Sequence, residues 1–316
     1  MSAARVVALS GGIGGAKLAL GLYRVLPPSA LTLIVNTGDD FEHLGLTICP
    51  DLDTTLYTLA GLANPELGWG RRDETWTFMK TLESLGAETW FRLGDADLAL
   101  HVERTQRLKA NQTLSAVIAA VAARFGIQAT ILPMSDDPVR TRVATAEGEL
   151  AFQDYFVRLR CAPEVRSLHF AGAAAAAVAP GALAALAAPD LEAIILAPSN
   201  PYLSVDPILA VPGMRAALRA RGVPVIAVTP LVGGQAIKGP TAKIMGELQL
   251  APSPLTIARH YAGLIDGFVL DERDAALAPQ FALPVHVTDT VMVELAGRER
   301  LAREVLHFAS RIGRRA

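Results

Sequence analysis

The stretch that decides the fold is Arg5-Val6-Val7-Ala8-Leu9-Ser10-Gly11-Gly12-Ile13-Gly14-Gly15-Ala16-Lys17. Its first six residues form an apolar run that is typical of a buried strand, and the residues from Ala16 to Val25 have helical spacing. Four glycines lie at the junction. The sequence therefore predicts a strand, a glycine loop and the start of a helix.

Glycines at such a junction let the backbone approach a phosphate, and the first N–H groups of the helix together with its dipole favour an anion. The loop matches neither of two common phosphate-binding motifs. Lys17 stands where G-x-G-x-x-G requires its last glycine, and it lacks the spacing and the following Ser or Thr of a P-loop. We predict that the loop binds a phosphate. The alternative is a tight strand-to-helix turn without a ligand.

Composition narrows the class of protein. The chain has 316 residues, of which 51% are apolar, enough for a sizeable core. Its 29 basic and 31 acidic residues leave no positive surplus of the kind that binds nucleic acid. The two cysteines, Cys49 and Cys161, are too few for a disulfide scaffold or a four-thiolate zinc site. We expect a cytoplasmic protein without a membrane segment, and we interpret the uncharged, Ala-rich residues 170–189, interrupted by Pro180-Gly181, as a helix or surface turn.

Short aliphatic runs alternate with helical patterns, which is typical of a parallel sheet with crossover helices. The predicted strands are Arg5 to Ser10, Leu31 to Asn36, Ala129 to Pro133, Ala193 to Ala197, Val225 to Val228, Gly267 to Leu270 and Val285 to Val287. We expect one α/β domain over residues 1–316, with a mostly parallel, Rossmann-like sheet and a helical insertion at about 55–127. Residues 142–156 are predicted to form a hairpin with Glu147-Gly148 as its turn.

Four carboxylates, those of Asp39, Asp40, Asp51 and Asp53, lie within fifteen residues near predicted strand ends. Crowded carboxylates repel one another unless a cation neutralises them, and oxygen ligands suit Mg²⁺ with a phosphorylated substrate. The alternatives are that Asp39 or Asp40 binds a ribose hydroxyl and that Asp53 is a helix N-cap.

The predicted helical insertion contains Arg92 and all three tryptophans, Trp69, Trp76 and Trp90. Arg92 can bind an oxyanion or stack on a planar ring, and the indole rings can wall a pocket for a flat ligand. The alternatives are a solvated arginine and an aromatic core. His43 and His101 show no zinc spacing, and we assign neither a catalytic role.

Two further polar segments follow predicted strands. Pro198-Ser199-Asn200-Pro201 offers short polar side chains and backbone amides. Residues 229–243 contain Gly233-Gly234 and two lysines, Lys238 and Lys243, and form a second candidate for oxyanion binding. Phosphate sites, carboxylates and basic side chains together indicate phosphoryl-group transfer by positioning and electrostatics.

The ordered series of these motifs resembles the 2-phospho-L-lactate transferase family of coenzyme F(420) biosynthesis, from residue 5 to about residue 290. The matching segments are Ser10 to Lys17, Asn36 to Asp40, Pro50 to Thr54, Gly68-Trp69-Gly70, Leu93-Gly94-Asp95, Leu132 to Asp137, Phe152-Gln153 and Pro198 to Pro201. The resemblance implies a phosphotransferase that moves a phospho-hydroxyacid from its guanosine diphosphate ester to the ribityl hydroxyl of a deazaflavin precursor and releases GMP. The acid is of the lactate, phosphoenolpyruvate or phosphoglycerate type.

The resemblance also implies Mg²⁺, commonly a homodimer, and roles for matched residues. Asp39 and Asp53 would be catalytic and would serve the metal, and Asp53 and Arg92 would contact the deazaflavin. The residues that would bind the guanosine diphosphate are Gly11, Gly12, Gly14, Gly15, Lys17, Ser199, Asn200, Gly233, Gly234 and Lys243. Two rival classes are a non-catalytic nucleotide-sugar-binding regulator of the gluconeogenesis-factor type and an NAD-dependent oxidoreductase. The missing third glycine counts against the oxidoreductase.

Overall fold

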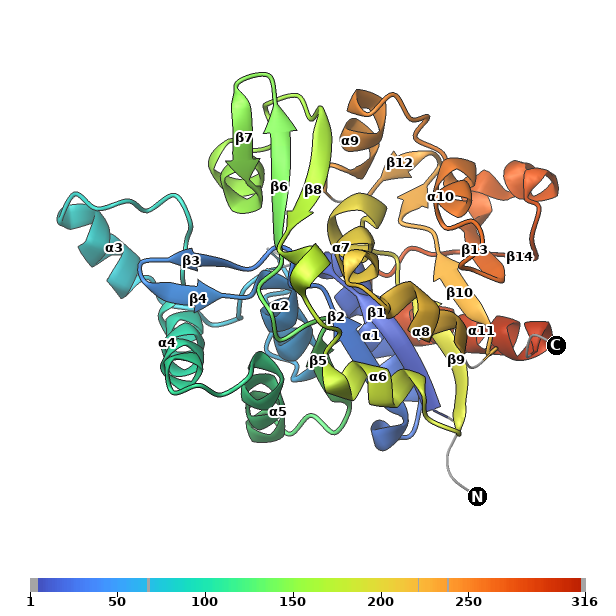
Figure 1. Ribbon diagram of the computed structural model, residues 1–316, viewed down its shortest axis with the longest axis horizontal. Coiled ribbons are helices and arrows are strands. Elements are labelled where there is room, and N and C mark those ends of the chain that lie inside the picture. Colours follow the sequence, from blue (N-terminus) through green and yellow to red (C-terminus); the bar gives the residue numbers. More distant parts are fainter. Residues whose placement is uncertain (1–4, 67–68, 221, 238, 314–316) are drawn as a thin grey trace.

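The computed structural model describes residues 5–66, 69–220, 222–237 and 239–313, and its centre is a parallel sheet of seven strands (Figure 1). In spatial order the strands are β14 (Val285–Thr288), β13 (Gly267–Asp271), β10 (Val225–Val228), β9 (Leu191–Leu196), β1 (Arg5–Ser10), β2 (Leu31–Val35) and β5 (Thr130–Pro133). These are the seven strands that the sequence predicts. The predicted α/β fold with a mostly parallel sheet is therefore confirmed.

The order of the strands creates a candidate ligand site at the carboxyl ends of the central strands. From β1 the chain moves to β2 and β5 on one side, and then returns to β9 on the other side of β1. This reversal between β1 and β9 opens a crevice at the carboxyl ends of the strands, where open α/β sheets bind ligands. The glycine segment follows β1, and residues 198–200 follow β9, so both segments lie at the crevice.

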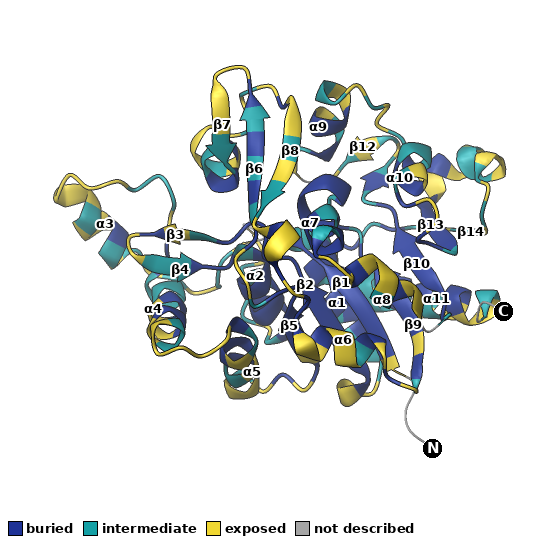
Figure 2. Cartoon of the chain, viewed as in Figure 1, coloured by how far each residue is buried: buried dark blue, intermediate teal, exposed yellow. Residues whose placement is uncertain are grey.

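Helices cover both faces of the sheet, and alternate strand residues point to opposite faces. Val6 and Ala8 pack on one face with α1 (Gly12–Val25), α2 (Pro50–Leu59), α5 (Leu114–Arg124) and α11 (Leu295–Ile312). Val7 and Leu9 pack on the other face with α6 (Pro180–Leu186), α7 (Asp206–Ala210), α8 (Met214–Ala220), α9 (Thr241–Glu247) and α10 (Pro254–His260). Figure 2 shows the central strands buried between these two layers.

Smaller elements surround the carboxyl edge of the sheet. A hairpin of β3 (Phe41–His43) and β4 (Leu46–Ile48) and two further helices, α3 (Thr77–Ser84) and α4 (Asp95–Lys109), lie between β2 and α5 in the chain. A separate antiparallel sheet contains β6 (Arg140–Thr145), β7 (Gly148–Ala151) and β8 (Ser167–Ala171). Short 3-10 or π-helical segments are Pro28–Ala30, Asp154–Arg158, Ala173–Ala175, Pro201–Val205 and Glu272–Gln280.

Three sequence-based details need correction or completion. The predicted hairpin is present, but Thr145 pairs with Gly148, so its turn is Ala146-Glu147, one residue earlier than predicted. Within residues 170–189 the only α-helix is α6, and in the described part of the chain no helix is long and apolar enough to cross a membrane. Strand β8 was not predicted.

The contact between α1 and α11 depends on a glycine. A Cβ atom on Gly21 would lie 2.2 Å from the backbone oxygen of Arg298, so the two helices approach more closely than alanine permits. By contrast, a Cβ on Gly246 in α9 would meet nothing within 4 Å.

We predict that Gly21→Ala lowers the free energy of unfolding by about 1–3 kcal/mol, the usual cost of overpacking. The matched control Gly246→Ala should leave stability unchanged or raise it by up to about 1 kcal/mol, because alanine is the better helix former. Urea unfolding of both variants measures the difference. Equal effects of the two substitutions would contradict the assigned packing.

Candidate active site

The glycine segment forms the first turn of α1 and not a separate loop before it. Gly11 is the N-cap, and Gly12 begins the helix with a φ of +64°. The N–H of Gly12 donates to Oδ1 of Asp51 at 2.7 Å, and the N–H of Gly11 donates to Oγ of Ser199 at 3.1 Å. The next amides, those of Ile13 and Gly14, belong to a first helical turn, which offers them no intrahelical acceptor. They are the amides suited to bind an anion.

Two of the glycines are required for packing. A Cβ on Gly14 would lie 2.5 Å from the carbonyl oxygen of Pro198, and one on Gly15 would lie 2.5 Å from Oγ of Ser199. The first turn of α1 therefore rests directly on the segment that follows β9. This contact forms the bottom of the crevice between β1 and β9. It also fixes the direction in which the N-terminus of α1 points.

A cavity of about 730 Å³ opens over this helix N-terminus. Segments that are distant in sequence line it together, including most of the predicted site residues: Gly11, Gly12, Gly14, Lys17, Asp39, Asp53, Arg92, Ser199 and Asn200. A volume of this size lies in the range of small-molecule sites. The structure thus brings together residues that the sequence could relate only by order.

Four predicted nucleotide contacts are not part of the cavity lining. Gly15 packs against Ser199, as described above. Gly233 and Gly234 form the two-residue turn between β11 (Leu231–Val232) and β12 (Gln235–Ala236), with φ values of +58° and +70°. Such a turn needs glycine for its positive φ angles, whether or not a ligand binds.

The fourth of these residues, Lys243, donates to the carbonyl oxygen of Pro163 at 3.1 Å and forms an ion pair with Glu247. Its ammonium group is therefore engaged outside the cavity. Lys238 and Gly68, which were also singled out from the sequence, lie outside the described residues.

The four aspartates Asp39, Asp40, Asp51 and Asp53 are all buried at the carboxyl ends of the strands. Burial raises the pKa of Asp40 to about 7 and that of Asp51 to about 6. Burial, with the nearby charge of Asp51, raises the pKa of Asp39 well above its ordinary value. The protein alone thus destabilises the charged form of this cluster, and a bound cation would favour it.

Asp51 connects the cluster to the glycine segment. Besides accepting from the N–H of Gly12, its carboxylate accepts from Nδ2 of Asn36 at 2.9 Å. These two hydrogen bonds tie together the ends of β1 and β2 and the start of α2. Asp51 therefore holds the N-terminus of α1 in place. Its carboxylate has this structural role whether or not a ligand binds.

Asp53 has a buried cation beside it. Arg104, fully buried on α4, donates from both terminal nitrogens to the two carboxylate oxygens, with Nη1 at 3.1 Å from Oδ2. Nη1 also donates to the carbonyl oxygen of Thr47 on β4 at 3.2 Å. Burial raises the pKa of Asp53, while the charges of Arg104 and His101 oppose that rise. Arg104 thus positions Asp53 at the cavity wall.

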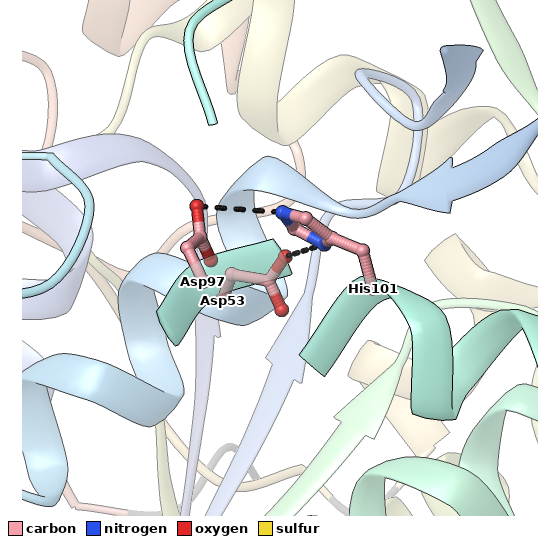
Figure 3. A group of neighbouring side chains, drawn as sticks. All are labelled: Asp53, Asp97 and His101. Atoms are coloured by element: carbon pink, nitrogen blue, oxygen red, sulfur yellow. Dashed lines mark ion pairs between the residues drawn. The ribbon is translucent and has the colours of Figure 1, made fainter. Parts of the chain in front are cut away.

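Asp53 also lies next to Asp97 and His101, as Figure 3 shows. The Nδ1 atom of His101 is 3.6 Å from Oδ2 of Asp53, and its Nε2 is 3.3 Å from Oδ2 of Asp97. One ligand atom from each of the three residues lies within 4.8 Å of the others, so this group could hold a metal ion. Asp39 lines the same cavity but is not a member of this group.

The sequence motifs gave no site role to Asp97, His101 or Arg104. Asp97 and His101 are four residues apart and therefore lie on one face of α4. This spacing in the sequence could have indicated that they share a ligand. The role of Arg104 had no such signal, because its partner Asp53 is on another helix, fifty-one residues away.

The segment Leu93-Gly94-Asp95 positions α4. Gly94 is the N-cap of that helix, and a Cβ there would lie 2.2 Å from the carboxyl carbon of Glu74. Glu74 accepts from the N–H groups of Ala96 and Asp97, and Asp95 accepts from the first amides of α3. These caps fix the start of α4, and hence where Asp97 and His101 lie.

One wall of the cavity is aromatic. Trp69, Trp90 and Phe91 line it together with Arg92, whose guanidinium lies 4.3 Å from the ring centre of Trp76. Phe91 also meets Phe41 edge to face, with the ring centres 4.8 Å apart. The insertion thus uses some aromatic rings as core and presents others to the cavity, which suits a flat ligand.

We predict that Arg104→Met lowers the free energy of unfolding by about 3–5 kcal/mol, because it leaves the buried carboxylate of Asp53 unpaired. The matched control on the same helix is Arg107→Met, which removes a more exposed pair with Glu103 and should cost about 1 kcal/mol or less. Urea unfolding measures both. The double variant Asp53→Asn with Arg104→Met should be more stable than Arg104→Met alone, and the opposite order would contradict the pairing.

The raised pKa of Asp40 predicts a pH dependence of stability in the ligand-free protein. Its ordinary value is 3.8 and its folded value is about 7, so the folded state binds more protons between these limits. The contribution of Asp40 to stability is present below about pH 4 and is lost as the pH rises to about 7. Asp40→Asn should remove this loss and be more stable than the parent at pH 7.5. Exposed Asp73→Asn is the control, and the prediction is wrong if both variants follow the parent at every pH.

Comparison with known proteins identifies the family. The family model described as 2-phospho-L-lactate transferase CofD matches residues 6–307. A phosphoenolpyruvate transferase of Streptomyces griseus is 41% identical over 317 residues, which cover 98% of this chain and 99% of the relative. A phosphoenolpyruvate transferase of Thermobifida fusca is 40% identical over 303 residues, covering 90% and 93%.

Among solved structures, a member of the UPF0052 family from Bacillus halodurans has a TM-score of 0.64 at 14% identity, covering 97% of this chain and 99% of that one. At this identity the likeness concerns the fold alone, and it agrees with the parallel sheet described above. The resemblance inferred from the ordered motifs is confirmed by the match over nearly the whole chain. The protein is a transferase and belongs to the 2-phospho-L-lactate transferase CofD family.

Proposed function

We propose that this protein transfers a phosphoenolpyruvyl group from its guanosine diphosphate ester to the terminal ribityl hydroxyl of an 8-hydroxy-5-deazaflavin precursor, releasing GMP, in coenzyme F(420) biosynthesis. One observation carries the proposal: a helix N-terminus, buried carboxylates and an aromatic wall with Arg92 line a single cavity. The names of the relatives favour the enolpyruvate form over lactate or phosphoglycerate.

The nucleotide half of the donor fits the crevice between β1 and β9. The Ile13 and Gly14 amides would bind phosphate oxygens, and Lys17, which also lines the cavity, would add positive charge. Ser199 and Asn200 lie across the crevice and would contact the nucleoside. In this proposal Gly15, Gly233, Gly234 and Lys243 shape the surroundings of the nucleotide, because none of them lines the cavity.

Magnesium fits the carboxylate side of the cavity. The buried Oδ1 atom of Asp39 has no hydrogen-bond partner among the described residues, and Asp53 and Asp97 add further oxygen atoms on the same cavity. Since Mg²⁺ prefers oxygen ligands, we propose Asp39 and Asp53 as its ligands, with Asp97 close by. When bound, the ion would neutralise charge on the phosphoryl group that is transferred.

Side chains and backbone amides would orient the acceptor, stabilise the leaving group and accept the proton. Arg92 and the aromatic wall would orient the deazaflavin so that its hydroxyl faces the phosphorus in line with the departing GMP. First-turn amides of α1 would stabilise the negative charge that develops on GMP. A carboxylate, Asp39 or Asp53, would accept the proton of the attacking hydroxyl. No covalent enzyme intermediate is needed.

The homodimer, which the family resemblance implies, and the cytoplasmic location both remain predictions.

The proposal is tested by incubating the protein and Mg²⁺ with the deazaflavin precursor and, separately, the guanosine diphosphate esters of enolpyruvate, lactate and phosphoglycerate. We expect the enolpyruvate ester to give the phosphodiester and an equal amount of GMP, detected by mass spectrometry. Asp53→Asn should turn over at least about a hundredfold more slowly, the loss typical of one preorganised charge in such a site. The control is Glu192→Gln, an exposed substitution on β9 outside the cavity lining.

Binding of the guanosine ligands without any transfer would contradict the proposed activity and would favour a regulator that only binds nucleotides. Preference for another acid would contradict the choice of enolpyruvate but would retain the transferase.

A further inference from the structure

A second, smaller cavity of about 150 Å³ adjoins the active-site cavity. Three residues, Asp39, Phe152 and Gln153, line both. Nε2 of Gln153 donates to the carbonyl oxygen of Asp39 at 3.1 Å, so this shared wall is hydrogen bonded. The small cavity therefore begins where Asp39 faces the proposed transfer site.

The far side of the small cavity is built by β6. Arg140, Thr141 and Arg142 all line it, opposite residues 38–42. Strand β6 is held on both sides, since Arg142 pairs with Ala151 of β7 and with His169 of β8. The N–H of Thr141 also donates to the carbonyl oxygen of Gly38 at 2.7 Å. The arginines thus project from a fixed backbone.

The polar groups in this cavity are incompletely paired. Arg140 donates to the carbonyl oxygen of Val139 and lies close enough to Asp40 for its charge to act on that carboxylate. Arg142 is half-buried, and its guanidinium has no hydrogen bond or ion pair with any described residue. The hydroxyl of Thr141, with its side chain 2% exposed, likewise has no hydrogen-bond partner in the described structure. The guanidinium of Arg142 is therefore left for a ligand, whereas Thr141, the preceding residue of β6, faces the opposite side of the strand.

The charges favour a small anion at Arg142. Asp40 is offset by Arg140, Asp39 belongs to the proposed Mg²⁺ site, and Glu42 is exposed at the outer side. A guanidinium offers paired N–H donors that match a carboxylate. A cavity of about 150 Å³ accommodates a molecule of the size of benzene, so a three-carbon acid fits.

We propose that this smaller cavity is the subsite for the acid group of the donor, with Arg142 binding its carboxylate. The inference rests on the proposed function, in which the acid is esterified to the terminal phosphate of guanosine diphosphate. With the nucleotide at the N-terminus of α1 and the phosphates at Asp39, the acid extends past Phe152 and Gln153 to β6. Arg142 thereby becomes a residue that determines which acids the enzyme accepts.

The test is calorimetric titration in the presence of Mg²⁺ and without the deazaflavin, using three ligands: GDP, its lactate ester and its ethyl ester. The ethyl ester differs from the lactate ester only in having a hydrogen atom in place of the carboxylate. We expect the parent to bind the lactate ester at least tenfold more tightly than the ethyl ester. Arg142→Ala should lose at least tenfold in affinity for the lactate ester and less than twofold for the other two ligands. Arg142→Lys should retain part of the preference.

The matched control is Arg166→Ala, an exposed arginine just before β8 that lines neither cavity. Equal losses for the lactate and ethyl esters in Arg142→Ala, or no loss for either, would overturn the subsite. If Arg142→Ala does not fold, Arg142→Gln is titrated in its place and the same results decide. Failure of the parent to bind GDP would instead overturn the proposed function, on which the subsite depends.

Discussion

Four buried carboxylates crowd the carboxyl end of the sheet, and among the described residues only one of them, that of Asp53, forms an ion pair with a guanidinium. Like charges in a poorly solvated site repel strongly, and burial further penalises each charged form. The protein alone meets this constraint only in part. Asp51 is satisfied by hydrogen bonds from the backbone and Asn36, whereas Asp39 retains a buried oxygen without a partner. Because this carboxylate oxygen has no partner in the described structure, a cation with a phosphorylated ligand is a suitable occupant of the cavity.

The same carboxylates organise the surrounding backbone. Asp51 holds the first turn of α1, and that turn rests on the segment after β9 because Gly14 and Gly15 have no Cβ atoms. Asp53 reaches Arg104 on α4, and Arg104 reaches β4. One charged cluster therefore connects the proposed nucleotide side of the cavity with helix α4. A change in any of these contacts is expected to affect both sides of the site.

The sheet was predictable because its strands are short, aliphatic and bounded by turn residues, so their pattern is local. Within the predicted helical insertion, no apolar periodicity marks α4 itself, because three of its four buried positions carry polar side chains, those of His101, Arg104 and Thr105. Polar residues in place of apolar ones remove the periodicity by which a helix is recognised. Their burial is understandable only with the fold in hand, since Asp53 and Thr47 supply the partners.

The glycine pairs show where pattern alone is ambiguous. Gly11-Gly12 and Gly233-Gly234 look alike in sequence, yet the first begins a helix at the cavity and the second forms a β-turn beside it. The hairpin of β3 and β4 escaped prediction because each strand has only three residues, and β8 escaped it because Ser167–Ala171 contains no aliphatic run. The candidate site was thus predictable as a set of segments, but its internal pairing was not.

The central claim is that the carboxylate cluster and the helix N-terminus act together on a phosphorylated ligand through a cation. The most direct measurement is the linkage between Mg²⁺ and GDP, obtained by titrating GDP into the protein with Mg²⁺ and again with a chelator. The account predicts that Mg²⁺ strengthens GDP binding at least tenfold in the parent and that Asp39→Asn abolishes most of this gain. Equal GDP affinity with and without Mg²⁺ in the parent would contradict it.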